Sequence, residues 1–493
     1  MNIQDLTIKK FHNGLIKKEF SATEAVEEFF DYISGKDKDI NAFIRLSKDL
    51  ALSQASAVDT DLASGKELDI LAGAPLAIKD NILIEGEPTT AASKILQNYR
   101  ASYDATVIKK LKSRNAIFLG KANMDEFAQG ASGENSAFGP TKNPHDLERV
   151  PGGTSSGSVA AVASDMAVAG LGSDTGGSIR QPASFCGVVG LKPTYGAVSR
   201  YGLIAMASSL DQIGPIAKTV EDAEILFEAI KGKDVLDSTS VNLKTENLKT
   251  KSLKEITIGL PDEYFIEGLD KEVASAVEEA IKTLKGLGIK FKKISLPHTK
   301  YAISAYYIIM PAEVSANLAR YDGVRYGRIT KRESQSVNLR DIYLKTRGEG
   351  FGEEVKRRII LGTFVLSSGY YDAYYAKAQK VRRLIKNDFD KAFDPSAGGV
   401  DVILTPTAPT PAFKIGEKIN DPLSMYLSDI FTAPVNLAGL PAISIPTLTN
   451  TDYTRTNTDS PHKSASLPVG FQLIGKYFHE ADILEIGKQY EAH

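Results

Sequence analysis

The stretch from Arg149 to Pro182 reads RVPGGTSSGSVAAVASDMAVAGLGSDTGGSIRQP. It places two glycine-rich clusters that carry hydroxyl groups, 152–157 and 176–178, at the two ends of a small-residue, apolar segment. Glycine lets the backbone approach a ligand or another strand without a Cβ in the way, and successive N–H groups can converge on an anion. The stretch therefore predicts a serine nucleophile beside a site that stabilises an oxyanion.

A flexible turn and a phosphate-binding loop are the two alternatives for this stretch. A flexible linker would not enclose the apolar runs 159–163 and 167–171, which predict the start of a buried helix and a buried strand. No GxxxxGK[ST] motif is present, and the run 170–172 lacks the third glycine of a dinucleotide fingerprint because Thr175 stands there. The pattern favours a catalytic site.

The composition is that of a globular protein: of 493 residues, 42% are hydrophobic and 24% are charged. A net charge of −2 is not the excess of positive charge typical of a protein that binds nucleic acid, so a role involving RNA would need a partner to hold the RNA. The start of the chain carries Asp5 and no apolar core, and apolar runs are broken by charges before about 18 residues. We expect a soluble, cytoplasmic protein that does not contact a membrane.

Strand and helix patterns alternate along the first half of the chain. The N-terminal residues 1–65 are predicted to be helical, with a capping box at 21–24. A strand-like run at 71–84 is followed by a helical pattern at 104–112 and a strand at 116–120. This alternation of strand and helix patterns predicts an α/β fold whose sheet is covered by helices on both faces.

The polar segment 234–255 is the best candidate for a domain boundary, and we interpret it as a surface connector. Strand patterns continue beyond it, so a single domain over 1–493 is expected. The polar segment 450–466 predicts an exposed loop. The other elements predicted after the hydroxyl clusters are a helix from 219 to 230, strands at 256–259, 289–294 and 400–404, a helix at 270–284 and a largely helical region at 301–393.

Three other catalytic systems fit the residues poorly: a Ser-His-Asp hydrolase, a cysteine amidotransferase and a metal hydrolase. The run 153–157 matches the GxSxG elbow formally, but the residues before it are not a buried strand that enters a sharp turn. Cys186 carries no sign of a poised thiol, and we interpret it as an inert, buried residue. No HExxH or paired-cysteine pattern occurs, so no metal is expected. The six histidines are predicted at surface or capping positions: His12, His145, His298, His462, His479 and His493.

Lys79 remains as the best available base, in an apolar run where a buried strand would not choose lysine. The ordinary alternative is a lysine whose stem packs while its ammonium reaches solvent. Burial would lower its pKa from about 10.4 by a few units and leave an amine that takes the Ser178 proton through a second hydroxyl. The N–H groups of Thr175, Gly176, Gly177 and Ser178 would then meet the developing oxyanion.

Three segments, 77–81, 152–158 and 172–182, resemble the amidase signature family. The resemblance implies a fold with a large mixed β-sheet core covered by helices, and a Ser-(cis-Ser)-Lys triad with Ser178 as nucleophile and Lys79 as base. The relay hydroxyl falls at Thr154, where the family has serine; threonine keeps the hydroxyl and stiffens χ1. We expect Thr154 to carry the proton, with Ser155 next in line.

Most of the chain, from about residue 5 to the C-terminus, resembles one branch of this family, the A subunits of glutamyl-tRNA(Gln) or aspartyl-tRNA(Asn) amidotransferases. That likeness implies that glutamine is hydrolysed and that its ammonia passes to a B subunit, which holds the mischarged tRNA and uses ATP and Mg. A small C subunit would complete a heterotrimer, and no cofactor is expected in this chain. The segments that carry the likeness are 124–127, 306–313, 317–327, 351–358, 362–375 and 428–432.

Glutamine is a zwitterion, so its site needs a cation for the carboxylate and an anion for the ammonium. In the resembling branch these groups look like Arg358 and Asp429, and the alternative for both is an ordinary structural ion pair. The pocket would also be lined by Tyr307 and by Gln129, Gly130 and Ser132. Two other functions stay open: a free-standing amidase that acts on an acyl, aryl or peptide amide, and a non-catalytic assembly protein.

Overall fold

One mixed β-sheet runs through the molecule in this computed structural model, which describes every residue except 1, 5, 243–251, 266–267, 328–337 and 448–466. The strand order is β1-β3-β2-β4-β6-β5-β10-β11-β9-β7-β8. The strands are β1 (Phe43–Leu46), β2 (Pro75–Lys79), β3 (Ile117–Ala122), β4 (Ala169–Asp174), β5 (Val189–Lys192), β6 (Gln212–Ala217), β7 (Thr257–Pro261), β8 (Lys290–Ile294), β9 (Val402–Pro406), β10 (Ala442–Pro446) and β11 (Gly470–Ile474).

The sheet is parallel around β2, which pairs with β3 and β4, and again where β7 pairs with β8 and β9. The other pairs are antiparallel. In β6, Ile213 and Ala217 pack in the core that contains α7, whereas Ile216 packs with α5 and α6. Because side chains alternate between the faces of a strand, helices cover both faces, as predicted.

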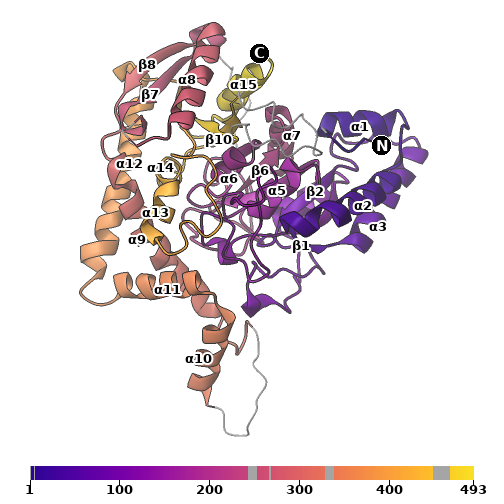
Figure 1. Ribbon diagram of the computed structural model, residues 1–493, viewed down its shortest axis with the longest axis horizontal. Coiled ribbons are helices and arrows are strands. Elements are labelled where there is room, and N and C mark those ends of the chain that lie inside the picture. Colours follow the sequence, from indigo (N-terminus) through magenta and orange to yellow (C-terminus); the bar gives the residue numbers. More distant parts are fainter. Residues whose placement is uncertain (1, 5, 243–251, 266–267, 328–337, 448–466) are drawn as a thin grey trace.

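Helices lie along the whole length of the sheet (Figure 1). The N-terminal helices are at one end of it, and α8 lies beside β7 and β8 at the other. The helices are α1 (Ile8–Ile16), α2 (Ala22–Ile40), α3 (Lys48–Ala63), α4 (Thr106–Lys112), α5 (Ser156–Ala163), α6 (Arg180–Phe185), α7 (Val220–Ile230), α8 (Lys271–Gly286), α9 (Ala302–Asn317), α10 (Leu339–Gly350), α11 (Glu353–Leu366), α12 (Lys377–Phe393), α13 (Pro422–Tyr426), α14 (Ala433–Ala438) and α15 (Glu480–Glu491).

Several predicted boundaries change. The N-terminal region is not wholly helical, because the short edge strand β1 interrupts it and pairs with β3. A four-residue strand with one buried side chain leaves almost no alternation to detect. The predicted strand at 71–84 shrinks to β2, whereas the helix and strand expected between the hydroxyl clusters are confirmed as α5 and β4.

The segment 234–255 begins with a turn that contains both exposed and buried residues, and because 243–251 lie outside the described residues, its role as a surface connector stays a prediction. Asp237 is 7% exposed and forms an ion pair with Arg200, and Asp234 accepts a hydrogen bond from Ser199. Strands from both sides of this segment belong to the same sheet, which favours a single domain. The predicted loop at 450–466 lies outside the described residues, and no described helix is long and apolar enough to cross a membrane.

Helices α9 and α11 pack with their backbones almost in contact at Gly362. A Cβ placed on Gly362 would lie 1.8 Å from the carbonyl oxygen of Pro311 in α9. This approach matters for the site because α9 carries Tyr307 and α11 carries Arg358.

Gly362→Ala is expected to lower the free energy of unfolding by about 1–3 kcal/mol, because the added methyl group forces the two helices apart. Gly348→Ala is the matched control: a Cβ there meets nothing within 4 Å, and alanine favours the α10 helix by up to about 1 kcal/mol. Urea denaturation of both variants measures the difference. Equal stability of the two variants would contradict the close packing of α9 on α11.

Candidate functional site

Lys79 is the last residue of β2 and is fully buried. Its Nζ lies 2.7 Å from Thr154 Oγ1, 2.9 Å from Ser155 Oγ and 3.2 Å from the Ser173 carbonyl oxygen. The alternative in which its ammonium reaches solvent is therefore wrong. β2 lies between β3 and β4, so the amine enters the site from inside the sheet.

Burial lowers the pKa of Lys79 from its ordinary value to about 7, although the buried carboxylates of Asp125, Asp174 and Asp211 oppose this shift. An amine removed from water loses the hydration that stabilises its charged form. Neutral and charged forms are thus both populated near neutral pH. A neutral amine can accept a proton from the hydroxyl groups that it contacts.

The two hydroxyl clusters meet beside this amine. The Gly153–Thr154 peptide bond is cis, and the Ser155 N–H donates to the Ser178 carbonyl oxygen at 3.1 Å. A Cβ on Gly153 would lie 2.2 Å from Asp125 Oδ2, so only glycine fits there. The Ser155 hydroxyl also donates to the Ser173 carbonyl oxygen at 3.2 Å and accepts from the Ser173 N–H at 3.3 Å.

A buried ion pair shapes the loop before Ser178. Burial opposes ionisation of Asp174, yet its contacts with Arg180 lower the pKa of this carboxyl to about 2. The Asp174 carboxylate accepts the Gly177 N–H at 2.9 Å, so that donor is already engaged. The Thr175 hydroxyl donates to Asp211 at 2.7 Å. Among the described residues, no acceptor is found for the N–H groups of Gly176 and Ser178.

Glycine is also required at the two positions before Ser178. A Cβ on Gly176 would lie 2.6 Å from the ring of Tyr306, and one on Gly177 would lie 2.2 Å from Thr432 Oγ1. The φ of Gly177 is 140°, in the region that favours glycine. Thr432 donates its hydroxyl proton to the Gly176 carbonyl oxygen at 2.6 Å. Gly176 and Gly177 thus lie directly against Tyr306 and Thr432, where a side chain has no room.

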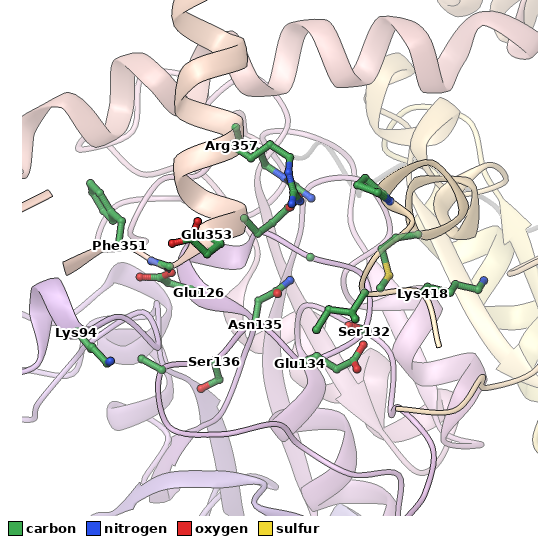
Figure 2. Close-up of a pocket in the computed structure, with 18 of the residues that line it drawn as sticks. Lys94, Glu126, Ser132, Glu134, Asn135, Ser136, Phe351, Glu353, Arg357 and Lys418 are labelled. Carbon is green, nitrogen blue, oxygen red and sulfur yellow. Dashed lines mark hydrogen bonds and ion pairs between the residues drawn. The ribbon is translucent and has the colours of Figure 1, made fainter. Parts of the chain in front are cut away.

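A cavity of about 400 Å³ is lined by several of the predicted substrate-binding residues and by none of Lys79, Thr154 and Ser155. Gly130, Ser132 and Arg358 are among its lining residues, and Figure 2 shows the acidic and basic side chains around it. Ser178 is not part of its lining in the described residues. Gln129 is fully buried, and neither polar atom of its amide group has a partner in the described part of the chain; the same holds for Ser132 Oγ.

Arg358 and Asp429 are both buried, at 3% and 5% exposure. Burial raises the pKa of Asp429 to about 8, although Arg358 lowers it. No hydrogen bond to the Asp429 carboxylate is found within the described ranges. The Arg358 guanidinium carbon lies 5.6 Å from the centre of the Tyr307 ring and 5.7 Å from that of Tyr426.

Two residues of this site were not predicted from the sequence, Glu354 and Tyr426. Glu354 accepts a hydrogen bond from Arg358 Nε at 2.8 Å, and the Tyr426 ring stacks on Tyr307 with 3.8 Å between ring centres. Glu354 lies one helical turn before Arg358, and this spacing is a usable signal in the sequence. Tyr426 has none, because it reaches Glu354 across 72 residues of chain.

The other candidate nucleophile systems lie elsewhere. Cys186 is fully buried; burial raises the pKa of its thiol well above the ordinary range, as expected for an inert residue. His145 contacts the Cys186 carbonyl oxygen, His298 pairs with Asp388, and His479 pairs with Asp482. His462 lies outside the described residues. Over the ranges that the structure describes, no group of three or more His, Cys, Asp or Glu side chains could hold a metal ion.

Comparisons with known proteins agree on one family. A family model described as Amidase matches residues 24–484. The A subunit of the glutamyl-tRNA(Gln) amidotransferase of Carboxydothermus hydrogenoformans is 54% identical over 100% of this chain and 98% of its own. The crystal structure of the corresponding protein from Thermotoga maritima has a TM-score of 0.79 at 44% identity, over 100% and 96% of the two chains. A peptide amidase of Stenotrophomonas maltophilia has a TM-score of 0.79 at 27% identity, over 100% and 97%.

The depressed pKa of Lys79 has a consequence for stability that does not depend on any activity. Between pH 7 and 10 the unfolded chain binds a proton at Lys79 and the folded chain does not, so raising the pH favours folding at this position. The free energy of unfolding of the wild type, minus that of Lys79→Met, is expected to rise by about 1.4 kcal/mol per pH unit. Urea denaturation at pH 7, 8 and 9 measures it, and a difference that stays constant would contradict the low pKa.

Proposed function

The chain belongs to the amidase family, and from this premise we propose that it is the glutaminase component of a tRNA-dependent amidotransferase. The observation that carries the proposal is the 2.7 Å contact between the fully buried amine of Lys79 and the Thr154 hydroxyl. A serine hydroxyl attacks an amide only when a base removes its proton, and this contact supplies the base and a hydroxyl relay.

In the proposed mechanism, the neutral Lys79 amine takes the Thr154 hydroxyl proton while Thr154 takes that of Ser178. Ser178 Oγ then forms a bond to the amide carbon of glutamine, and the carbonyl oxygen becomes an oxyanion. The N–H groups of Gly176 and Ser178, for which the described part of the chain offers no acceptor, are suited to stabilise it, with Thr175 and Gly177 completing the loop. When the oxyanion collapses, the C–N bond breaks and the proton returns through Thr154 to the leaving nitrogen, which departs as ammonia. Water then hydrolyses the Ser178 ester to release glutamate and restore the Ser178 hydroxyl.

Thr154 is better placed than Ser155 to relay the proton, because the hydroxyl groups of the two residues have different hydrogen-bond partners. The Ser155 hydroxyl is tied to the Ser173 backbone through both its donor and its acceptor function. The only hydrogen bond found for the Thr154 hydroxyl within the described residues is the one to Lys79, so its proton is free to move. Ser155 then serves to orient the Lys79 amine, which lies 2.9 Å from its hydroxyl.

The charged ends of glutamine would bind to Arg358 and Asp429. Arg358 pairs with the substrate carboxylate, and Asp429, whose carboxylate has no hydrogen-bond partner among the described residues, accepts the ammonium. Tyr307 covers this site, and Gln129, Gly130 and Ser132 face the amide end. The unpaired polar atoms of Gln129 and Ser132 support a ligand there, because buried polar groups are otherwise hydrogen-bonded.

The proposal includes partners. The relatives at 54% and 44% identity are named as the A subunits of glutamyl-tRNA(Gln) amidotransferases. We propose that this chain likewise works in the cytoplasm in a heterotrimer with B and C subunits. The ammonia would pass to the B subunit, which would hold the mischarged tRNA and bind ATP and Mg. The chain itself would need no cofactor.

A free-standing amidase is the second candidate, and the fold shared with a peptide amidase favours it. The buried charges distinguish the two, because Arg358 and Asp429 suit a zwitterion and would be a desolvation cost for an apolar amide. A non-catalytic assembly protein would not need an amine of lowered pKa beside two hydroxyl groups.

The relay assignment is tested by Thr154→Ala and Ser155→Ala in the assembled complex. Thr154→Ala is expected to lower kcat for glutamine hydrolysis by about 10²–10⁴-fold, because the proton loses its path to Lys79. Ser155→Ala is expected to lower it by less than ~10-fold, since Lys79 keeps the Thr154 contact. An electrophilic glutamine analogue is expected to modify the wild-type chain at Ser178, and Ser178→Ala should abolish this modification. Peptide mapping of the labelled chain measures it. A fully active Thr154→Ala variant with an inactive Ser155→Ala variant would reverse the two roles.

Partner dependence separates the two candidate enzymes. Glutamine hydrolysis by the full-length chain is expected to rise at least ~10-fold when B and C subunits and mischarged tRNA are added. The reason is that binding of the mischarged tRNA at the partner is coupled to glutamine hydrolysis in this chain. Asparagine, which has the same charges one methylene group closer to the amide, serves as the control substrate. Rapid turnover of apolar or peptide amides without partners would support the free-standing amidase instead.

A further inference from the structure

Arg358 is held in one orientation by the residues around it. Its Nε donates to Glu354 Oε1 at 2.8 Å, and its guanidinium lies beside the rings of Tyr307 and Tyr426. Its Nη1 has only Met310 Sδ, at 3.6 Å, as a partner in the described residues. Because thioether sulfur is a weak acceptor, the Nη edge of the guanidinium remains available for a carboxylate.

Glu354 is itself held from other directions. Its second oxygen contacts Arg357 in a short ion pair, and its first accepts the Tyr426 hydroxyl at 3.2 Å. The Glu354 side chain is 11% exposed, whereas that of Arg357 is 50% exposed. A buried carboxylate with three donors is a fixed anchor, and Arg357 contributes the least buried of the three contacts.

Asp429 is a buried carboxyl group that, within the described residues, accepts no hydrogen bond at its carboxylate and forms no ion pair with Arg358, whose ion pair is with Glu354. The two groups influence each other, because Arg358 is the main charge that lowers the raised pKa of Asp429. Opposite charges attract strongly where water is excluded, and an unpaired buried charge is costly. If Arg358 lost its anchor, a direct bond to Asp429 would satisfy both groups. That bond would fill the two positions that the charges of a zwitterionic substrate need.

We propose that Glu354 is a positioning residue that keeps Arg358 away from Asp429, so that the carboxylate and ammonium groups of an amino-acid amide can bind between them. The proposal rests on the proposed function, because it concerns the same substrate site. It assigns to Glu354 a role in substrate selection and none in the proton transfer at Lys79. Loss of Glu354 therefore impairs binding of charged substrates and spares the reactivity of Ser178.

The test compares two reagents that both modify Ser178 in the full-length chain. One is 6-diazo-5-oxo-L-norleucine, which has the charged amino-acid head of glutamine: its diazo carbon gains the proton that Ser178 gives up, Ser178 Oγ bonds to that carbon, and N2 leaves. The other is methanesulfonyl fluoride, which is uncharged: Ser178 Oγ bonds to sulfur, fluoride leaves, and the proton passes through Thr154 to Lys79. Glu354→Ala is expected to slow modification by the first reagent about 10–100-fold and to leave the second within about two-fold.

Matched variants separate orientation from simple loss of charge. Glu354→Gln keeps an acceptor for Arg358 Nε and is expected to restore the rate with the charged reagent to within about five-fold of the wild type. Arg357→Ala removes only the exposed ion pair and should change it by less than about three-fold. In an Asp429→Asn background, Glu354→Ala should slow modification by the charged reagent at least about five-fold less than it does in the wild type, because the competing carboxylate is gone.

Three results would overturn the proposal: equal slowing of both reagents by Glu354→Ala, no slowing of either, or the same cost of Glu354→Ala in the Asp429→Asn background. The uncharged reagent also reports folding, since a misfolded variant loses reactivity toward both. A wild-type chain that reacts with methanesulfonyl fluoride and never with the glutamine analogue would overturn the proposed function, and this proposal with it. A wild-type chain that reacts with both, and variants that fail the expected pattern, would overturn the role of Glu354 alone.

Discussion

The site depends on one interaction, the contact of the Lys79 amine with two hydroxyl groups inside the sheet. An amine at the end of a central parallel strand is removed from water, and a buried charge without a partner costs several kcal/mol. Releasing the proton removes that cost, so burial itself makes the base. The surrounding backbone must come close enough to exclude water, and glycine at 153 and 157 permits this: a Cβ at either position would lie 2.2 Å from an oxygen atom.

The acidic residues near Lys79 raise its pKa without cancelling the effect of burial. Asp125, Asp174 and Asp211 are each buried and could hold an ammonium, yet each is committed to neighbouring loops. Asp125 accepts two backbone N–H groups, from Gly133 and Asn135. Burial raises the pKa of Asp125 and of Asp211 to about 6. These carboxylates shape the pocket and the loop before Ser178 without neutralising Lys79.

What the sequence could predict depends on how local each signal is. A lysine in an apolar strand and two glycine-flanked hydroxyl clusters can be recognised within short stretches of sequence. The alternation of helix and strand patterns predicts one sheet, which brings these stretches close together. The contacts of Glu354 with Tyr426, and the engagement of the Gly177 N–H by Asp174, depend on side-chain directions that no short window encodes. The edge strand β1 was missed because its pairing with β3 spans more than 70 residues.

The catalytic and recognition groups come from separate parts of the fold. Lys79, Thr154 and Ser178 lie on β2 and around α5 and the start of α6, so the sheet sets their geometry. Tyr307, Arg358 and Asp429 come from α9, α11 and the 3-10 helix Leu427–Asp429. Thr432 joins the two parts, because its hydroxyl donates to Gly176, in the loop before Ser178, and its N–H to the Asp429 carbonyl oxygen. In the proposed mechanism, amide chemistry and substrate charge are thus set by different elements, so that a change in α11 would alter which amide binds without altering how it is cleaved.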